Sequence, residues 1–333
     1  MKRRLFFFPQ YKAGMATNPY CDDYISSLRK KIEVVGFSSL PLPRSIQFFL
    51  GAFKADVYIV NWLESVVFLR FSILQFIFAY LGLVVIKIRR KRIVWMFHNI
   101  KPHEGNTLLS KILQNHLHKN ASLIVAHSKE AEAYARGLGD DKVVYYCHPI
   151  NNKEYTPSIK VEECAIFIWG KILPYKGVLE FIKNEATIES NCKIVIIGSC
   201  NDPELDRQIK ESTNENIIYE NRRASYDEIA AYCRSAKIVL FPYIGECVSS
   251  SGALIDTLVM GGIPIGPNKG AFRDLKEEGC CVTYEDIREV FSLIENKNPL
   301  IDAIKQREFC MKNSWDTFTD NILKELNILN SNQ

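Results

Sequence analysis

Residues 165–183 read AIFIWGKILPYKGVLEFIK, and this stretch passes from one apolar run through a loop into another. The first run, 165–169, is β-branched and aromatic, which predicts a buried strand, and the second, 178–183, predicts a helix. The loop between them carries two glycines and two lysines: Gly170, Lys171, Lys176 and Gly177. Two ammonium groups beside the N–H groups of a helix N-terminus favour a diphosphate, although an ordinary loop with two solvated lysines fits the same residues.

The same alternation of strand and helix continues in both directions. The expected strands lie at residues 5–8, 57–61, 93–97, 122–127, 142–147, 165–169, 193–198, 217–220, 237–242 and 263–266. The expected helices lie at residues 18–31, 71–90, 108–119, 129–137, 178–183, 204–212, 226–235, 251–260, 285–294 and 299–329. Continuous apolar strands between helices indicate parallel sheets that are buried on both faces.

A polar, proline-bearing segment at 148–158 divides this pattern into two Rossmann-like halves, in keeping with the length of 333 residues. We therefore predict an α/β protein with one domain at 1–150, a second at 160–312 and a closing helix at 313–333. Ligands of open α/β sheets bind at the carboxyl ends of strands, so the chemistry belongs in a cleft between the two domains.

The composition excludes several classes of protein. Hydrophobic residues make up 47% and charged residues 24%, as in an ordinary folded protein, and a net charge of +4 is too mild to predict a nucleic-acid partner. The ten cysteines include no C-x-x-C pair and no Cys/His spacing that zinc requires, so we expect reduced thiols, as in the cytosol. Pro102 separates His98 from His103, so these two residues need not share a helix face and we expect no metal site.

A second chemistry-bearing cluster occupies residues 241–274, FPYIGECVSSSGALIDTLVMGGIPIGPNKGAFRD. A loop with the carboxylate Glu246 leads into a helix that carries Asp256. Small residues stand at the start of that helix: Ser249, Ser250, Ser251 and Gly252. Hydroxyl and N–H groups at a helix start suit phosphate oxygens, although a plain N-cap with extra serines fits as well.

Together these motifs resemble those of the GT-B glycosyltransferases, in particular the large bacterial retaining family (group 1, family 4 type) of surface polysaccharide synthesis. The segment G-K-x-x-x-x-K-G at 170–177 resembles the family's G-R-x-x-x-K-G, and residues 241–274 resemble its P-x-x-x-E, S/F-G-x-x-x-x-E, C-G-x-P-V-I and G-G-x-x-E-L run. The resemblance implies a GT-B fold, with two Rossmann-like domains facing a central cleft and a C-terminal helix that crosses back to the first domain.

The resemblance also implies roles for the residues of the second domain. Lys171 and Lys176 take the places of the family's diphosphate-binding Arg and Lys, and the Gly170 and Ser249–Gly252 loops complete the donor site. Glu246 takes the place of the carboxylate near the donor sugar. Asp256 takes that of the carboxylate on the ribose hydroxyls, although nine residues separate it from Glu246 where the family usually has seven. The other interpretation of Asp256 is a partly buried helix residue with a local partner.

In the first half, His98 follows directly on the expected strand 93–97, which predicts a position at the carboxyl edge of the sheet. An imidazole there can donate to a sugar hydroxyl or exchange a proton near neutral pH, and the family places a histidine near the reacting sugar at this point. A histidine bonded to neighbouring backbone is the alternative. Loop residues Gly14, His103 and Glu104 are candidates for contact with the acceptor.

The most apolar stretch, 71–86, stands beside the basic run KIRRKR at 87–92. Sixteen residues fall short of the ~20 that a membrane span needs, so we expect a buried or surface-lying helix. Basic residues beside apolar surface attract anionic lipid, although a solvated helix end explains the same run. We therefore expect peripheral attachment to the inner face of the cytoplasmic membrane.

These observations predict a hexosyltransferase that uses a nucleoside-diphosphate sugar, UDP-hexose before GDP-hexose, without a cofactor or metal. The expected acceptor is a lipid-linked saccharide of O-antigen, capsule or exopolysaccharide synthesis. Two other functions share the fold: a UDP-sugar epimerase, which would need carboxylate bases at the sugar, and a non-catalytic nucleotide-binding scaffold.

Overall fold

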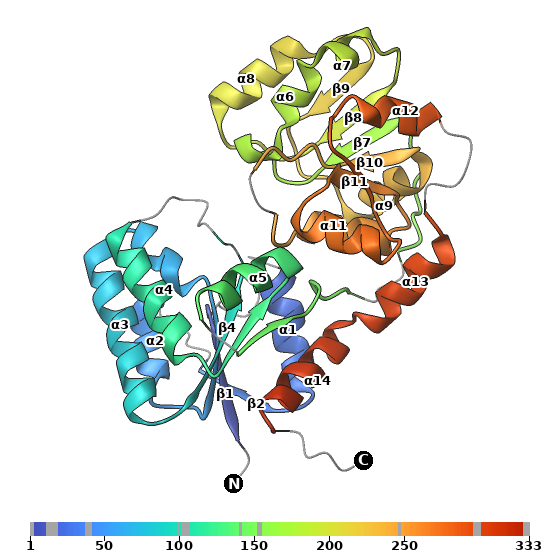
Figure 1. Cartoon of the computed structure of the whole chain (residues 1–333). Helices are drawn as coiled ribbons and strands as arrows, with labels where there is room; N and C mark the ends of the chain where they lie inside the picture. The colour runs from blue at the N-terminus through green and yellow to red at the C-terminus, as the bar shows by residue number, and fades with distance from the viewer. Residues whose placement is uncertain are drawn as a thin grey trace. The chain divides into compact units, whose positions relative to one another are not determined.

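The computed structural model describes residues 3–10, 19–36, 42–98, 100, 107–139, 142–151, 155–245, 248–295 and 301–328. The chain divides into two compact units, Met1–Cys147 with Trp315–Gln333 (unit 1) and His148–Ser314 (unit 2). Each unit holds one six-stranded sheet in which neighbouring strands pair in parallel (Figure 1). The predicted architecture of two Rossmann-like α/β sheets is confirmed.

The sheet of unit 1 has the strand order β2-β1-β3-β4-β5-β6. Its strands are β1 (Arg4–Phe8), β2 (Glu33–Val35), β3 (Val57–Asn61), β4 (Arg92–Phe97), β5 (Leu123–Ala126) and β6 (Val143–Tyr145). All except β2 lie where apolar runs predicted them. The prediction missed β2 because this edge strand has three residues, none of them fully buried, and so lacks an apolar run.

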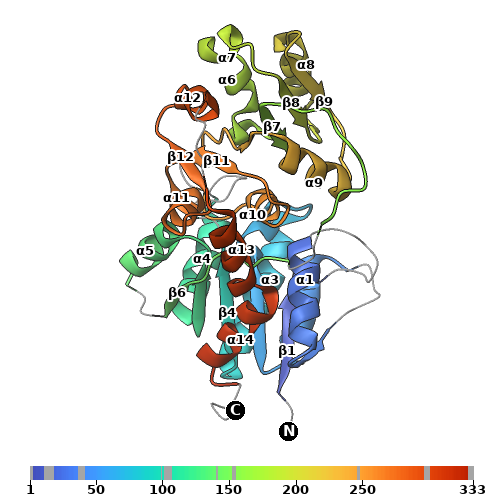
Figure 2. The same cartoon turned by 90° about the vertical axis from the view of Figure 1, so that its right-hand side faces the viewer.

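Helices cover both faces of this sheet, as Figures 1 and 2 show. They are α1 (Pro19–Arg29), α2 (Arg44–Gly51), the 3-10 helix η1 (Leu63–Phe68), α3 (Ser72–Ile88), α4 (Leu108–Asn120), α5 (Lys129–Gly137) and α14 (Trp315–Glu325). Side chains alternate along β1: Phe6 and Phe8 share a core with α2, α3, α4 and α5, whereas Leu5 and Phe7 share one with α1 and α14. Burial on both faces explains why these strands read as continuous apolar runs.

The C-terminal helix α14 packs on unit 1, beside α1. The ring of Trp315 lies 5.0 Å from that of Tyr20 and 5.4 Å from that of Tyr24, and the hydroxyl of Ser27 donates to the carbonyl of Trp315. Further along α14, Ile322 is fully buried in the same core. The predicted closing helix on the first domain is thus confirmed.

Residues 299–329, which the sequence predicts as one helical region, form two helices in the part that the structure describes. The first, α13 (Ala303–Lys312), belongs to unit 2, and α14 belongs to unit 1. Ile150 forms a parallel bridge with Ser314, and its N–H donates to the carbonyl of Asn313 over 2.8 Å. This pairing with a distant segment decides where the first helix ends.

The sheet of unit 2 has the order β12-β11-β10-β7-β8-β9. Its strands are β7 (Ile166–Trp169), β8 (Ile194–Ile197), β9 (Ile217–Glu220), β10 (Ile238–Leu240), β11 (Pro264–Pro267) and β12 (Val282–Tyr284). Its other helices are η2 (Pro174–Lys176), α6 (Val178–Ile182), α7 (Glu185–Glu189), α8 (Pro203–Ser212), α9 (Tyr226–Ser235), α10 (Gly252–Val259), α11 (Gly270–Glu277) and α12 (Glu289–Glu295).

Both faces of this second sheet are also covered. Ile166 and Ile168 share a core with α6, α8 and α12, whereas Phe167 between them stacks on Tyr232 of α9 with 4.8 Å between the rings. Across both units the prediction missed the short helices α2, η1, η2, α7 and α11 and the strand β12, and it began α12 too early. In α7 and α11, charged residues interrupt the apolar pattern, so the pattern itself was weak there.

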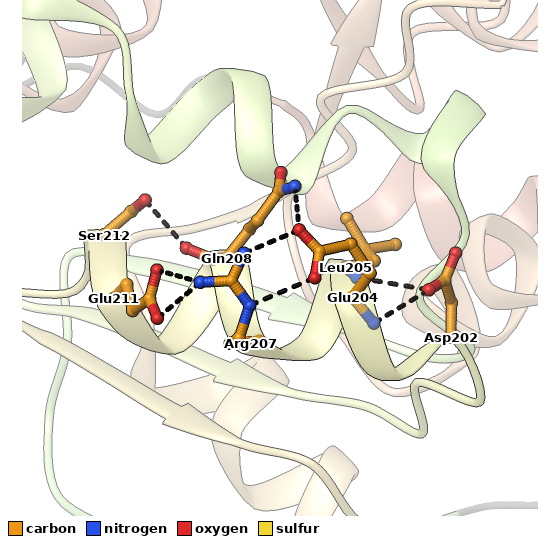
Figure 3. Close-up of polar contacts among 7 residues, drawn as sticks. All are labelled: Asp202, Glu204, Leu205, Arg207, Gln208, Glu211 and Ser212. Carbon is orange, nitrogen blue, oxygen red and sulfur yellow. Dashed lines mark hydrogen bonds and ion pairs between the residues drawn. The ribbon is translucent and has the colours of Figure 1, made fainter.

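Helix α8 shows how local chemistry sets a boundary that the sequence did predict (Figure 3). Asp202 accepts from the N–H groups of Glu204 and Leu205, which would otherwise lack partners at the helix start. Within the helix, the guanidinium of Arg207 bonds to Glu204 at 2.6 Å and to Glu211 at 2.6 Å. These exposed pairs lie on the outside of unit 2, and they strengthen the helix without taking part in a site.

Helix α3 corresponds to the apolar stretch that the sequence singled out. It spans 17 residues, and among the described helices none is long and apolar enough to cross a membrane. Ala79, Leu83 and Ile86 on one side are fully buried in unit 1, whereas Ile73, with 67% exposure, stands on the other side. The helix is therefore half in the core and half in solvent, which fits the predicted surface-lying helix.

Candidate functional site

The end of β7 brings together two of the predicted donor-binding segments in unit 2. Gly170 has φ +104, a backbone conformation that favours glycine. A methyl group built on Gly170 would lie 3.7 Å from Cβ of Ala253 in the first turn of α10 and 3.8 Å from Nζ of Lys176. The lysine loop and the start of α10, which are about 80 residues apart in the sequence, therefore meet beside Gly170.

Gly177 permits a second close approach at this edge of the sheet. It has φ +65, and a Cβ at this position would lie 2.0 Å from the carbonyl oxygen of Pro242, which follows β10. The N–H groups of Ile244 and Gly245 donate to the carbonyl of Tyr175 in the lysine loop, over 3.0 and 3.3 Å. The loop after β7 and the loop after β10 are thus held together by backbone contacts that no larger residue at position 177 would allow.

The two predicted lysines have different environments. Lys171 is exposed, whereas Lys176 is half-buried, with its Nζ 5.4 Å from the centre of the Tyr243 ring. Burial lowers the pKa of Lys176 below the usual lysine range, and the neighbouring Tyr175 opposes this shift. A partly desolvated ammonium interacts strongly with an anion, because little water screens it. Lys176 is therefore the stronger candidate for the diphosphate.

The serine-rich segment caps α10 at the same edge. The hydroxyl of Ser251 accepts from the N–H of Leu254 and lies 3.2 Å from the hydroxyl of Tyr243. Ser249 is buried, Ser250 and Ser251 are half-buried, and Gly252 is exposed. Among the described residues no acceptor is bonded to the N–H groups of Gly252 and Ala253, so these two donors remain available to a ligand.

Asp256 lies one turn further along α10, on the same face as Gly252. Its carboxylate is half-buried and close enough to Cys233 of α9 to affect that thiol: burial raises the pKa of Cys233 to about 12, and Asp256 adds to the shift. Next to it, the indole N–H of Trp169 at the end of β7 donates to Thr257 over 3.0 Å. Asp256 thus lies one helical turn C-terminal to the N–H group of Gly252. Its contact with ribose remains a prediction.

In unit 1, His98 directly follows β4 and lies at the carboxyl edge of the sheet. Its Nε2 lies 3.0 Å from Oδ1 of Asn61, whose amide nitrogen donates to the carbonyl of Phe8 over 2.8 Å. Because the amide nitrogen is used there, Oδ1 must accept, so the proton of the neutral imidazole sits on Nε2. The ring is buried and stacks on Trp62 with 4.2 Å between centroids. The contacts with Asn61 and Trp62 hold the ring of His98 in place, and its role at the sugar remains a prediction.

The sequence prediction did not select three residues of these clusters: His127, Tyr20 and Tyr243. His127 follows β5 as His98 follows β4, and its Nδ1 donates to the carbonyl of Tyr146 while its Nε2 accepts from the hydroxyl of Tyr20. The same signal, a histidine directly after an apolar strand, was present in the sequence. Tyr243 lacked such a signal, because it is defined only by its contacts with Lys176 and Ser251.

Four predicted residues, Glu246, Gly14, His103 and Glu104, lie outside the residues that the structure describes. Their proposed contacts with the donor sugar and the acceptor therefore remain predictions.

Known proteins resemble this chain in part of its sequence and in its fold. Residues 163–297 match the model of a family described as glycosyl transferases, group 1. The chain is similar to Anabaena HepE in complex with UDP and glucose, with 14% identity, a TM-score of 0.70 and coverage of 98% of this chain and 100% of that one. The chain is also similar to a sucrose-phosphate synthase from Thermosynechococcus elongatus, with 13% identity, a TM-score of 0.63 and coverage of 88% of this chain and 81% of that one.

A UDP-forming trehalose-phosphate synthase from Burkholderia vietnamiensis has 9% identity, a TM-score of 0.68 and coverage of 99% of both chains. Among curated proteins no sequence matches this one. At such low identities the solved structures show the fold alone, and that fold is the predicted GT-B.

The close approach at Gly177 yields a stability prediction. Gly177→Ala places a methyl group against the carbonyl of Pro242 at a backbone conformation that alanine avoids, so the free energy of unfolding of unit 2 should fall by ~2 kcal/mol or more. Gly252→Ala is the matched control: nothing lies within 4 Å of its built Cβ, and the helix start tolerates alanine. Urea denaturation of both variants checks this, and equal midpoints would contradict the described packing.

Proposed function

We propose that the chain, whose residues 163–297 match the group 1 glycosyl transferases, is a nucleotide-sugar glycosyltransferase that transfers a hexose from UDP-hexose to a lipid-linked saccharide. UDP is the proposed nucleotide because HepE was crystallised with UDP and glucose and the Burkholderia enzyme is UDP-forming. GDP-hexose is the second candidate donor. The proposed setting is O-antigen, capsule or exopolysaccharide synthesis.

The observation that carries the proposal is the meeting of Gly170, the Lys176 ammonium and the first turn of α10 at one edge of the unit 2 sheet. When the sugar leaves, negative charge develops on the diphosphate. Fixed cations and backbone N–H groups can stabilise that charge without reorganising, which is where most catalytic stabilisation of this kind comes from. In the proposal Lys176, Lys171 and the N–H groups of Gly252 and Ala253 hold the diphosphate.

The remaining residues complete the proposed reaction. Asp256 contacts the ribose hydroxyls, Ser249, Ser250 and Ser251 line the phosphate loop, and Glu246 lies near the donor sugar. In unit 1, His98 interacts with the reacting sugar, and Asn61 holds its imidazole in one tautomer. Gly14, His103 and Glu104 contact the acceptor. A UDP-sugar epimerase is the alternative; formation of an epimer without consumption of an acceptor would identify it.

The two lysines should contribute unequally to binding of the nucleotide. Lys176→Ala should weaken the affinity for UDP by about 1.5–3 kcal/mol, because it removes a poorly screened charged hydrogen bond to phosphate. Lys171→Ala should cost less, since this side chain is exposed and water screens its charge. Isothermal titration calorimetry with UDP measures both. If both variants bind UDP as tightly as the wild type, the lysines do not bind the diphosphate and the proposal is refuted.

The pH dependence of UDP affinity tests the role of Lys176 a second way. Because burial lowers the pKa of Lys176, its ammonium loses its proton at a lower pH than an ordinary lysine. A bound diphosphate favours the charged form, so UDP affinity should be full below this lowered pKa and should decline as the pH rises through it. Lys176→Arg should remove that decline, because arginine keeps its charge throughout the range.

His98→Ala should lower the transfer rate by about 10²–10⁴-fold while the affinity for UDP changes little. The reason is that UDP is held by unit 2, whereas His98 belongs to unit 1. Steady-state kinetics and UDP titration on one preparation separate the two quantities. His118→Ala, at a half-buried histidine on α4, is the control. If rate, affinity and melting temperature all fall together, His98 is a structural residue.

The proposal includes attachment to a membrane surface through α3. Exposed apolar side chains form a stripe along this helix: Ile73, Leu74, Ile77, Tyr80, Leu81 and Ile88. Phe49 of α2 lies 5.6 Å from Phe78 of α3 and 5.6 Å from Phe53, so the apolar surface continues onto α2. A helix with one apolar face and cations at its ends can lie in the interface between headgroups and acyl chains.

Replacing two residues of this stripe tests the attachment. The double variant Ile73→Ser, Ile77→Ser should bind vesicles containing anionic lipid more weakly, by roughly 1 kcal/mol or more per side chain removed from the interface. Ile304→Ser on α13 is the control, because Ile304 is 71% exposed but lies in unit 2. Flotation assays measure the bound fraction. If the double variant, the control and the wild type bind these vesicles equally, the α3 stripe is not the membrane-binding surface.

A further inference from the structure

A basic cavity lies at the edge of the unit 1 sheet opposite to His98. Its volume is about 640 Å³, within the range of small-molecule sites. Five cationic side chains line it: Arg3, Arg4, Arg90, Lys91 and Arg92. They stand at the amino ends of β1 and β4, and the six residues of β4 separate this edge from His98 by about 20 Å. The cavity is thus separate from the carboxyl edge where the proposed chemistry takes place.

The two carboxylates of this cavity do not cancel its positive charge. Asp56 pairs with Lys91 over 2.7 Å and accepts from the N–H of Arg4 over 3.1 Å, and these bonds hold the pKa of Asp56 below its usual range. It therefore orders the wall of the cavity as part of an internal ion pair. Glu33 is the other lining carboxylate. Among the described residues no side chain is bonded to the guanidinium of Arg4 or to that of Arg90.

Arg90 occupies a position where the backbone favours glycine. Helix α3 ends in a Schellman motif, because the N–H of Lys91 donates to the carbonyl of Ile86 and that of Arg90 to the carbonyl of Lys87. Arg90 itself has φ +52 in this motif. A left-handed conformation is unfavourable for a non-glycine residue, so this chain keeps an arginine where glycine would be more stable. Structural needs alone do not explain the arginine.

The helix dipole accounts for part of the basic cluster but not for all of it. Cations near the C-terminus of α3 interact favourably with its carbonyl end. Arg89, the C-cap residue of α3, is directed away from the cavity: its guanidinium donates to the hydroxyl of Tyr58 over 3.1 Å within unit 1. Arg3 and Arg92 have backbone partners, since their guanidiniums donate to the carbonyls of Asn327 and Leu326 after α14. Arg4, however, comes from a different segment than Arg90, at the start of β1. Two separate segments therefore direct cations to one cavity.

We propose that this cavity binds a phosphate group, as a second anion site of the protein apart from the donor site. Guanidinium groups match phosphate geometry through paired N–H donors, and several arginines around a concave site provide that match from more than one direction. The phosphate belongs either to the headgroup of an anionic lipid or to a free phosphate compound. Ile88, the last residue of the α3 stripe, is 74% exposed and only two residues from Arg90, so a lipid on α3 would reach the cavity.

Arg90→Gly provides a sharp test, because glycine fits the Schellman position and should maintain or raise the melting temperature while the cation is lost. Arg4→Gln removes the charge from the other segment. Lys119→Gln, at an exposed lysine of α4 that does not line the cavity, is the control for net charge. The full chain, with UDP present to occupy the donor site, is titrated with inorganic pyrophosphate. Arg90→Gly and Arg4→Gln should each weaken binding about tenfold or more, and Lys119→Gln should not.

A second set of measurements distinguishes the two sources of phosphate. The same proteins are mixed with phosphatidylcholine vesicles with and without phosphatidylglycerol. A loss of phosphatidylglycerol-dependent binding in Arg90→Gly and Arg4→Gln supports a lipid headgroup, whereas a loss confined to pyrophosphate supports a free phosphate compound. If neither ligand distinguishes these two variants from the wild type, the phosphate site is refuted. UDP titration of each variant reports separately on the donor site, so failure of one proposal does not affect the other.

Discussion

Parallel strand pairing is the constraint on which both units depend. In a parallel sheet all strands end at one edge, and the loops that follow them meet there whatever their separation in the sequence. In unit 2 this edge collects the lysine loop after β7 and the loop after β10 that leads to α10. The sheet must also be covered on both faces, which selects continuous apolar strands and supplies a rigid base for the loops.

Dense packing at the carboxyl edge of the unit 2 sheet has a direct electrostatic consequence. Gly170 and Gly177 permit backbone approaches that bring Lys176 against Tyr243 and the start of α10. The same crowding removes water from the ammonium of Lys176 and lowers its pKa. Desolvation of a cation is unfavourable, and an anion bound next to the cation offsets the lost hydration by stabilising the charged form. A phosphate at the site proposed above would thus gain from the partial burial of Lys176.

The two edges of the unit 1 sheet carry different chemistry. At the carboxyl edge, His98, His127 and Tyr20 form a buried aromatic and polar cluster whose hydrogen bonds assign definite tautomers to both imidazoles. At the amino edge, arginines surround an open cavity. Helix α3 runs along the side of the sheet and ends beside this cavity, with its exposed apolar stripe facing solvent. The basic run at 87–92 is thus not one uniform strip, because Arg89 bonds inward while Arg90, Lys91 and Arg92 line the cavity.

The sequence by itself determined the fold class, nearly all of the strands, the closing helix and the segments that carry the lysines and serines. Local patterns suffice for these, because buried parallel strands are apolar throughout and helix starts carry recognisable caps such as Asp202 and Ser251. It did not determine β2 or α7, whose few residues form elements only through pairing and packing. The tertiary structure alone decided that Lys176 is half-buried while Lys171 is exposed, that Tyr243 lies against Lys176, and that Arg4 and Arg90 share a cavity. These facts depend on contacts between residues about 70 to 90 positions apart, and no local pattern records them.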